Sequence, residues 1–381
     1  MCDKRVWAAC FGEETDDLRF IRSRFADRLH APDIRAADAE GATYTHVAAQ
    51  ANQPDILRAL LDAGADARRR RNDGATPLFV AAQEGAAACV RLLLYVTSND
   101  AAHNDEDEDG VTPLYAAAAH GHLDVVMFLL GRGAPADRAM RDGATPLFIA
   151  CQNGHEAVAR ALLARAAKPD VTRAPWGQTP LFNAVMNGHP DLVRLLVSRR
   201  AGRAARVNVA CAGDGDGLLR GCTPLHACNS GFAARCARGA WKWRERMIRP
   251  HLRGVERRHR FEESALALLR AGADPRLRDA CGWTVDAGLR ASHDPEGREL
   301  GELLRAVRLV GSYDSWGAQC PKHPFVFRHV TRWQIGALLR RAQPGDDEEP
   351  AASLGSQVHV RFPGRMDEAA FVRIAAFSGV A

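Results

Sequence analysis

The chain has 381 residues, of which 46% are hydrophobic and 25% charged, and its formal net charge is +5. These are the values of a soluble folded protein, and no apolar run approaches the length of a membrane span. No apolar signal segment follows the first five residues. The ten Cys residues are scattered and form no Cys-x-x-Cys pair, which favours reduced thiols in an intracellular protein. We therefore expect a cytoplasmic protein, with the nucleus as the alternative location.

The first predicted elements lie near the N-terminus, where apolar and charged residues alternate irregularly from Val6 to Leu29. This pattern predicts a degenerate pair of short helices. Such a pair would cap one end of a larger array, because the terminal units of repeat proteins need a polar outer face and are usually atypical.

A unit of fourteen residues, Asp142 to His155, then organises most of the chain. Its Asp-Gly pair is a turn signal, because Gly accepts a positive φ at no steric cost. Thr145 is a good helix N-cap, Pro146 suits the first helical position, and Gly154 can end the helix. The Thr-Pro-Leu core of this unit occurs in five copies, which begin at Thr76, Thr112, Thr145, Thr179 and Thr223.

This unit resembles the ankyrin repeat, whose period is about 33 residues. The resemblance extends from about Trp7 to Gly311 and implies an all-α fold, an α-solenoid of stacked helix-turn-helix repeats with β-hairpin fingers. Most copies place Phe or Tyr where the family motif has His, which adds apolar area and removes one hydrogen-bond option. The expected organisation is an N-terminal capping repeat at 1–40, a repeat array at 41–311, and a small helical C-terminal extension at 312–381 with an acidic linker near 344–350.

Two insertions interrupt the expected array: a long finger near 199–220 and a basic insertion near 232–261. Between Arg235 and Arg260 there are ten Lys and Arg residues against two Glu, a local charge of +8. Trp241 and Trp243 lie among these residues, and Arg with interleaved aromatic rings can bind nucleic acid. The same stretch can contact an acidic protein or form a solvated surface. We favour the last two interpretations, because one basic stretch without a nucleic-acid-binding fold is a weak signal.

Two groups of residues suggest a metal site, and each has a simpler interpretation. The acidic run from Asp105 begins like a calcium loop, but its twelfth position is Ala116 instead of the Glu that an EF-hand requires. A zinc site could be drawn among four residues that lack the paired spacing of zinc modules: Cys222, His226, Cys228 and Cys236. No nucleophile and base occur together in a supporting motif. We expect no bound metal, no cofactor and no enzymatic activity.

The resemblance implies a scaffold whose concave face carries the finger tips and the exposed side of each first helix. The positions free to vary there flank the turn glycine or precede the glycine that ends the first helix. The candidate partner-binding residues are Asn72, Asp73, Gln83, Glu84, Glu108, Asp109, Val111, His120, Arg141, Asp142, Gln152, Asn153, Trp176, Gln178, Met186 and Asn187. Trp176 has two interpretations, an interface anchor or a ring that packs on the neighbouring finger.

These observations predict a monomeric, non-catalytic scaffold that binds another protein on the concave ankyrin face. Two alternatives stay open. The first is a substrate adaptor of a ubiquitin ligase, recruited through the C-terminal helices, where residues 330–339 weakly resemble a SOCS box without its Leu and Cys. The second is association with nucleic acid through the basic insertion.

Overall fold

The computed structural model describes residues 3–11, 16–26, 33–97, 104–198, 204–213, 220–228 and 255–280, together with 282, 284–285 and 287. The chain divides into two units, 1–325 and 326–381, and every described residue belongs to the first. Most of the basic insertion and the whole predicted C-terminal extension lie outside the described residues.

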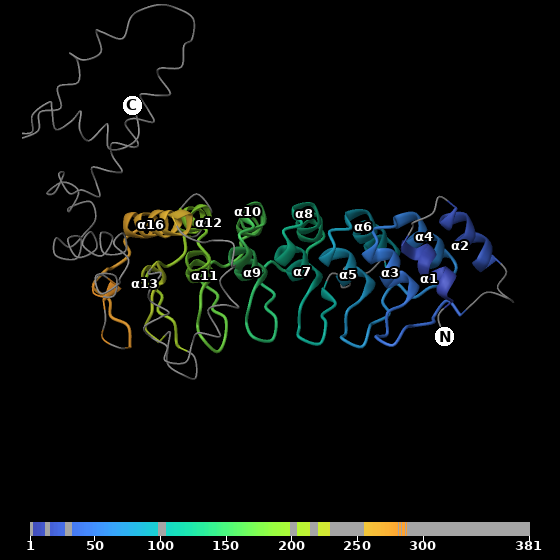
Figure 1. Cartoon of the computed structure of the whole chain (residues 1–381), viewed down its shortest axis with the longest axis horizontal. Helices are drawn as coiled ribbons and strands as arrows, with labels where there is room; N and C mark the ends of the chain where they lie inside the picture. Colours follow the sequence, from blue (N-terminus) through green and yellow to red (C-terminus); the bar gives the residue numbers. More distant parts are fainter. Residues whose placement is uncertain are drawn as a thin grey trace, which may run out of the picture. The chain divides into compact units, whose positions relative to one another are not determined.

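The described part of the chain forms helix pairs that follow one another in sequence order (Figure 1). The first helices of the pairs are α1 (Lys4–Phe11), α3 (Tyr44–Gln50), α5 (Pro77–Gln83), α7 (Pro113–His120), α9 (Pro146–Asn153), α11 (Pro180–Met186) and α13 (Pro224–Ala227). The second helices are α2 (Asp17–Ala26), α4 (Pro54–Asp62), α6 (Ala87–Val96), α8 (Leu123–Gly131), α10 (Glu156–Ala164), α12 (Pro190–Val197) and α16 (Val255–Arg270).

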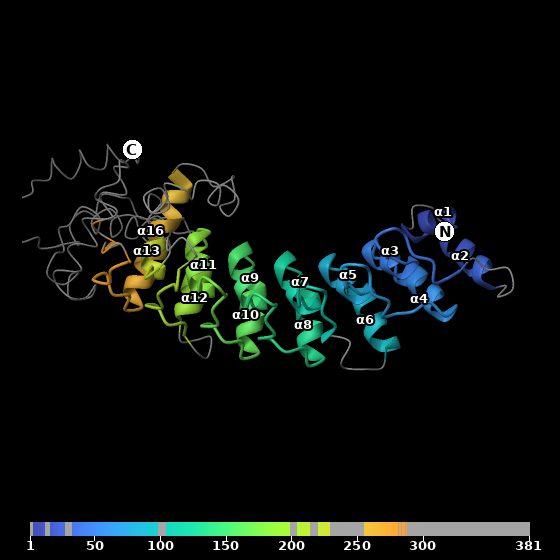
Figure 2. The ribbon, with the colours of Figure 1, turned by 90° about the horizontal axis from the view of Figure 1, so that it is seen from below.

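Each first helix packs against the first helices of the neighbouring pairs, and each second helix packs against its neighbours in a second row. The loops that join the pairs extend to one side as fingers, and the row of first helices lies between the fingers and the row of second helices (Figure 1). The view from the finger side shows the two rows side by side (Figure 2). The predicted all-α repeat array is therefore confirmed for these residues.

The recurring motif acts as its local chemistry predicts. Thr145 lies just before α9, and its hydroxyl accepts a hydrogen bond from the backbone N–H of Phe148 at 3.2 Å. Pro146 occupies the first helical position, where a missing N–H costs nothing. Gly154 ends the helix with a φ of 86°, a conformation that favours glycine. The same N-cap bond forms at Thr76, Thr112 and Thr179.

Two repeats keep a His at the fourth motif position, and the ring of one of them, His46, links neighbouring repeats. The Nδ1 atom of His46 accepts from the backbone N–H of Thr43 at 3.1 Å. Its proton is therefore on Nε2, which donates to the carbonyl of Ala75 in the next finger at 3.1 Å. His226 makes the same bond to Thr223 at 3.2 Å. In this arrangement His satisfies backbone groups and does not act as a metal ligand.

The N-terminal helix pair is anchored by Tyr44, which occupies the place of the motif proline. Its side chain is 0% exposed. The hydroxyl accepts from the backbone N–H of Asp3 at 2.8 Å. Its ring packs against Trp7 of α1 and Phe25 of α2, with centroid separations of 5.9 and 6.4 Å. This one residue explains how a degenerate pair of helices attaches to the regular repeats.

Helix α16 is longer than the other described second helices: it has 16 residues, whereas α12 has 8. It begins at Val255, inside the predicted basic insertion, so the insertion continues directly into helix. Its later part packs on α12 like any other second helix, and Glu263 accepts a charged hydrogen bond from Arg194 at 3.2 Å. Within the described ranges, no helix is both long and apolar enough to span a membrane.

Candidate functional site

One backbone hydrogen bond ties each finger to the finger before it. The backbone N–H groups of Asn72, Glu108, Arg141, Ala174, Ala212 and Ala280 donate to the carbonyls of Glu40, Asp73, Asp109, Asp142, Trp176 and Arg220, at 2.7 to 3.1 Å. The fingers differ from the expected β-hairpins: the described residues show isolated bridges but no extended strand. A finger has room for only one bridging pair before its turn. The resulting ladder holds the finger tips in a row.

The candidate residues lie along this row and at the ends of the first helices, a surface that we call the finger face. Most of them reach the molecular surface. The exposed residues are Asn72, Asp73, Glu84, Glu108, Asp109, His120 and Arg141, and those of intermediate exposure are Gln83, Val111, Asp142, Gln152, Asn153, Trp176, Met186 and Asn187. Their use by a partner stays a prediction.

Gln178 does not belong to this surface, which corrects the sequence-based assignment. Its side chain is 1% exposed, and its buried Oε1 atom has no hydrogen-bond partner among the residues that the structure describes. The residue after the turn glycine points into the base of the finger, where Gln178 pairs with Arg173 through the backbone. A side chain in that position cannot contact a partner protein.

Several finger residues also have structural roles. The side-chain amide of Asn72 donates to the carbonyl of Ala39 in the preceding finger at 3.0 Å. Asp73 accepts from the backbone N–H of Ala75 at 3.0 Å, which closes its own turn. These residues therefore hold the fingers in place and leave only part of each side chain for recognition.

Trp176 lies in a cluster of aromatic and charged side chains that sequence reasoning did not find. Arg173 donates from Nε to Asp142 at 2.6 Å. Its guanidinium carbon lies 5.1 Å from the Trp176 ring centroid and 5.7 Å from that of Phe148. Tyr115 is close by: burial, with a smaller effect of Asp142, raises its pKa to about 12. The Arg173 guanidinium of the same finger thus lies against the Trp176 ring, and the residue is of intermediate exposure.

A second group that sequence reasoning missed is centred on Asn183 in α11. Asn183 is 4% exposed and donates from Nδ2 to the Oε1 atom of Gln152 in α9 at 3.1 Å. Asn153 donates to the carbonyl of Ala119 at 2.7 Å, and Asn187 to the carbonyl of Asn183 at 2.9 Å. Comparison of the copies could have revealed Asn183, because the equivalent positions hold the nonpolar Val80, Ala116 and Ile149.

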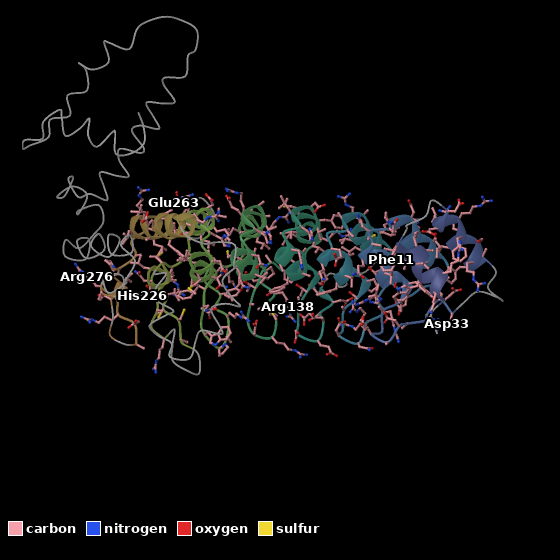
Figure 3. All side chains as sticks on the ribbon, viewed as in Figure 1. Phe11, Asp33, Arg138, His226, Glu263 and Arg276 are labelled. Carbon is pink, nitrogen blue, oxygen red and sulfur yellow. The ribbon has the colours of Figure 1, made fainter. Side chains whose placement is uncertain are left out.

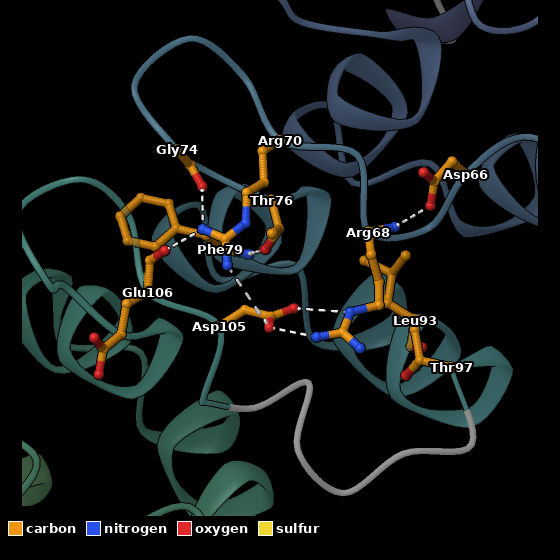
Figure 4. Close-up of polar contacts among 10 residues, drawn as sticks. All are labelled: Asp66, Arg68, Arg70, Gly74, Thr76, Phe79, Leu93, Thr97, Asp105 and Glu106. Atoms are coloured by element: carbon orange, nitrogen blue, oxygen red, sulfur yellow. Dashed lines mark hydrogen bonds and ion pairs between the residues drawn. The ribbon is translucent and has the colours of Figure 1, made fainter.

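The acidic run of the third finger forms ion pairs with both neighbouring fingers, and Figure 4 shows its contacts with Arg68 and Arg70 of the preceding finger. Arg68 contacts both carboxylate oxygens of Asp105, at 2.5 and 3.1 Å. Arg70 donates to the carbonyl of Glu106, and Arg138 donates to the carboxylate of Glu106 at 2.5 Å. Figure 3 shows Arg138 among the finger loops, away from Glu263 on the row of second helices. The carboxylates that suggested a calcium loop thus join three fingers.

The cysteines of the array have the properties of core residues. Burial raises the pKa of Cys89 to about 11, and burial together with the nearby Asp17 raises that of Cys10 to about 12. Burial alone raises the pKa of Cys211 to about 12. A thiol with such a pKa is a poor nucleophile at neutral pH. Among the described residues, no three His, Cys, Asp or Glu side chains are placed to share a metal ion.

Comparison with known proteins agrees with this architecture. The family description "Ankyrin repeats (3 copies)" matches residues 7–104 and 95–173, and "Ankyrin repeats (many copies)" matches residues 154–197. A curated protein, the E3 ubiquitin-protein ligase KEG of Arabidopsis thaliana, is 40% identical over 77 residues. That match covers 20% of this chain and only 5% of the ligase, so most of the ligase has no counterpart in it.

Ankyrin repeats are generally protein-protein interaction modules and typically have no enzymatic activity. The matched residues run from 7 to 197, which is half of the chain. The helix pairs, the linked fingers and the recurring Thr-Pro-Leu caps agree with those matches. The chain belongs to the ankyrin repeat family.

Proposed function

We propose that this chain is a non-catalytic scaffold that captures a partner protein on its finger face. The supporting observation is the division between the buried and exposed positions of the repeat. The motif residues Thr145, Pro146 and Leu147 are buried, whereas Arg141 is exposed and Gln152 partly exposed in the same repeat. The buried Thr, Pro and Leu repeat from copy to copy, whereas the accessible position of Arg141 holds Asn72 and Glu108 in the two preceding fingers.

The variable positions differ in chemistry along the array, as expected of a specific recognition surface. The residue two places before the turn glycine is Asn72, Glu108, Arg141 and Pro175 in successive fingers. Backbone hydrogen bonds fix the spacing of these fingers. Binding would therefore require little reordering of the backbone, which lowers its entropic cost.

The test is site-specific photo-crosslinking in cells. A photoreactive amino acid replaces Asn72, Glu108 or Arg141 on the finger tips. The matched control variants carry it at Arg58 or Arg160, which are equally exposed but lie on the second helices. We expect a distinct crosslinked protein from the tip variants and none from the controls. Crosslinks from the second-helix variants alone, or from neither set, would contradict the proposal.

The ligase-adaptor and nucleic-acid alternatives depend on residues 326–341 and 232–254, which lie outside the described residues. They stay predictions with separate tests. An adaptor should co-purify elongin or cullin subunits only when residues 326–341 are present. A nucleic-acid-binding protein should shift a labelled oligonucleotide with an affinity that falls steeply as salt rises.

A further inference from the structure

The finger face changes its chemical character along the array. At the ends of α5 and α7 it carries Glu84 and His120, both exposed. At the ends of α9 and α11 the corresponding surface carries only uncharged side chains, which are Gln152, Asn153, Met186 and Asn187. We call these four residues the neutral section.

The amide groups of the neutral section are fixed in orientation but only partly satisfied. The Nδ2 atoms of Asn153 and Asn187 bond to helix carbonyls, and the Oε1 atom of Gln152 accepts from Asn183. These bonds define which end of each amide faces outward. Among the described residues, the Nε2 atom of Gln152 and the Oδ1 atoms of Asn153 and Asn187 have no hydrogen-bond partner. The surface thus offers one donor and two acceptors in fixed positions.

Trp176 supplies an apolar contact on the finger that leads into α11. Two contacts hold it in place: the Arg173 guanidinium lies against its ring, and its carbonyl accepts from Ala212 at 2.9 Å. Asp142 in turn neutralises Arg173 at 2.6 Å. The ring is therefore presented with little rotational freedom to lose, a property of strong interface anchors.

We propose that the neutral section binds an extended, uncharged peptide segment of the partner, with one large apolar side chain against Trp176. This inference rests on the proposed function and specifies the partner's binding element. Helix α11 has 7 residues and is about 10 Å long. About three residues of extended chain span that length. Their backbone N–H and C=O groups match the amide acceptors and donor, and a charged side chain would be desolvated there without a counter-charge.

The test pans a random displayed peptide library against the full chain and measures the affinity of the enriched peptides by fluorescence polarisation. The key variant is Gln152→Glu. It retains the Oε1 acceptor for Asn183 and replaces the outward Nε2 donor with a charged oxygen. Gln50→Glu is the matched control, because Gln50 holds the same repeat position at the end of α3, is exposed, and is not one of the candidate partner-binding residues. Thermal unfolding of each variant shows whether the fold is kept.

We expect enriched peptides with an uncharged stretch and one large apolar residue. Gln152→Glu and Trp176→Ala should each weaken the binding of these peptides at least about tenfold, whereas Gln50→Glu should change it less than about twofold. Enrichment of charged peptides, enrichment of none, or equal effects of the two Glu variants would overturn the inference. The crosslinking experiment on the finger tips is independent of this one. If the peptide-binding inference fails, crosslinking still decides whether the proposed function is correct.

Discussion

Replacing Tyr44 with Ala should detach the N-terminal helix pair while the central repeats stay folded. Removing a fully buried aromatic side chain costs about 3–5 kcal/mol, and Tyr44 is 0% exposed. The hydrogen bond from Asp3 to the hydroxyl contributes about 1 kcal/mol of this stabilisation. Each ring contact, with Trp7 and with Phe25, contributes a similar amount. Tyr44→Phe removes only the hydrogen bond and should cost about 1 kcal/mol.

Hydrogen exchange measured by mass spectrometry locates this loss. Because repeats interact mainly with their neighbours, the destabilisation should be concentrated near the substituted residue. In Tyr44→Ala we expect faster exchange in α1 and α2 and unchanged protection in α9 to α12. The reasoning is refuted if α9 to α12 lose protection to the same extent. It is also refuted if the free energy for opening α1 falls by less than about 1 kcal/mol.

Three further predictions concern the motif, a buried histidine and the acidic finger. Thr145→Ala should lower the free energy of unfolding by about 1 kcal/mol, because it removes the N-cap hydrogen bond. Denaturant titration measures this change, with the exposed Thr172→Ala as the control. Equal effects of the two substitutions would contradict the role of the N-cap. Burial lowers the pKa of His46 from 6.5 to about 4, so the folded state binds fewer protons, and stability should fall as pH drops from 6.5 to 4. The free energy of unfolding should fall by at most about 3 kcal/mol over this pH range. In His46→Gln it should fall less steeply with pH. If the two proteins give parallel pH profiles, the lowered pKa of His46 is refuted. Asp105→Asn should lower the free energy of unfolding by about 1–2 kcal/mol, because it weakens the pair with Arg68. Millimolar calcium should leave the unfolding midpoint of the parent chain unchanged, and a calcium-dependent rise would contradict the structure.

The local parts of the repeat were predictable because their causes are local. Thr145 caps a helix that starts at the next residue, and Gly154 ends it within the same short segment. The turn glycine and the proline act through their own backbone angles. Sequence alone therefore predicts where each first helix starts and stops, and the period predicts that the copies stack.

The candidate site was predicted less completely, because exposure depends on packing between copies. Gln178 was assigned to the surface from its place beside the turn glycine, yet its side chain is buried. Three other copies hold the small, buried residues Ala75, Ala144 and Cys222 at this position, whereas a fourth holds Val111, which is partly exposed. The ion pair of Arg173 with Asp142 joins two fingers that are separate in sequence, and its guanidinium also lies over the Phe148 ring of α9. No motif spacing indicates such a contact.

The link between the last described fingers shows that the array keeps its register independently of chain length. The turn glycines at Gly221 and Gly282 are nearly twice as far apart in sequence as those of regular copies. Even so, Ala280 donates to the carbonyl of Arg220 at 2.9 Å, as in the regular fingers. The connection between α13 and α16 can thus acquire or lose sequence without moving the residues of the finger face. Sequence changes in this connection, including the insertion of a reporter domain, can therefore be made separately from changes in the finger face.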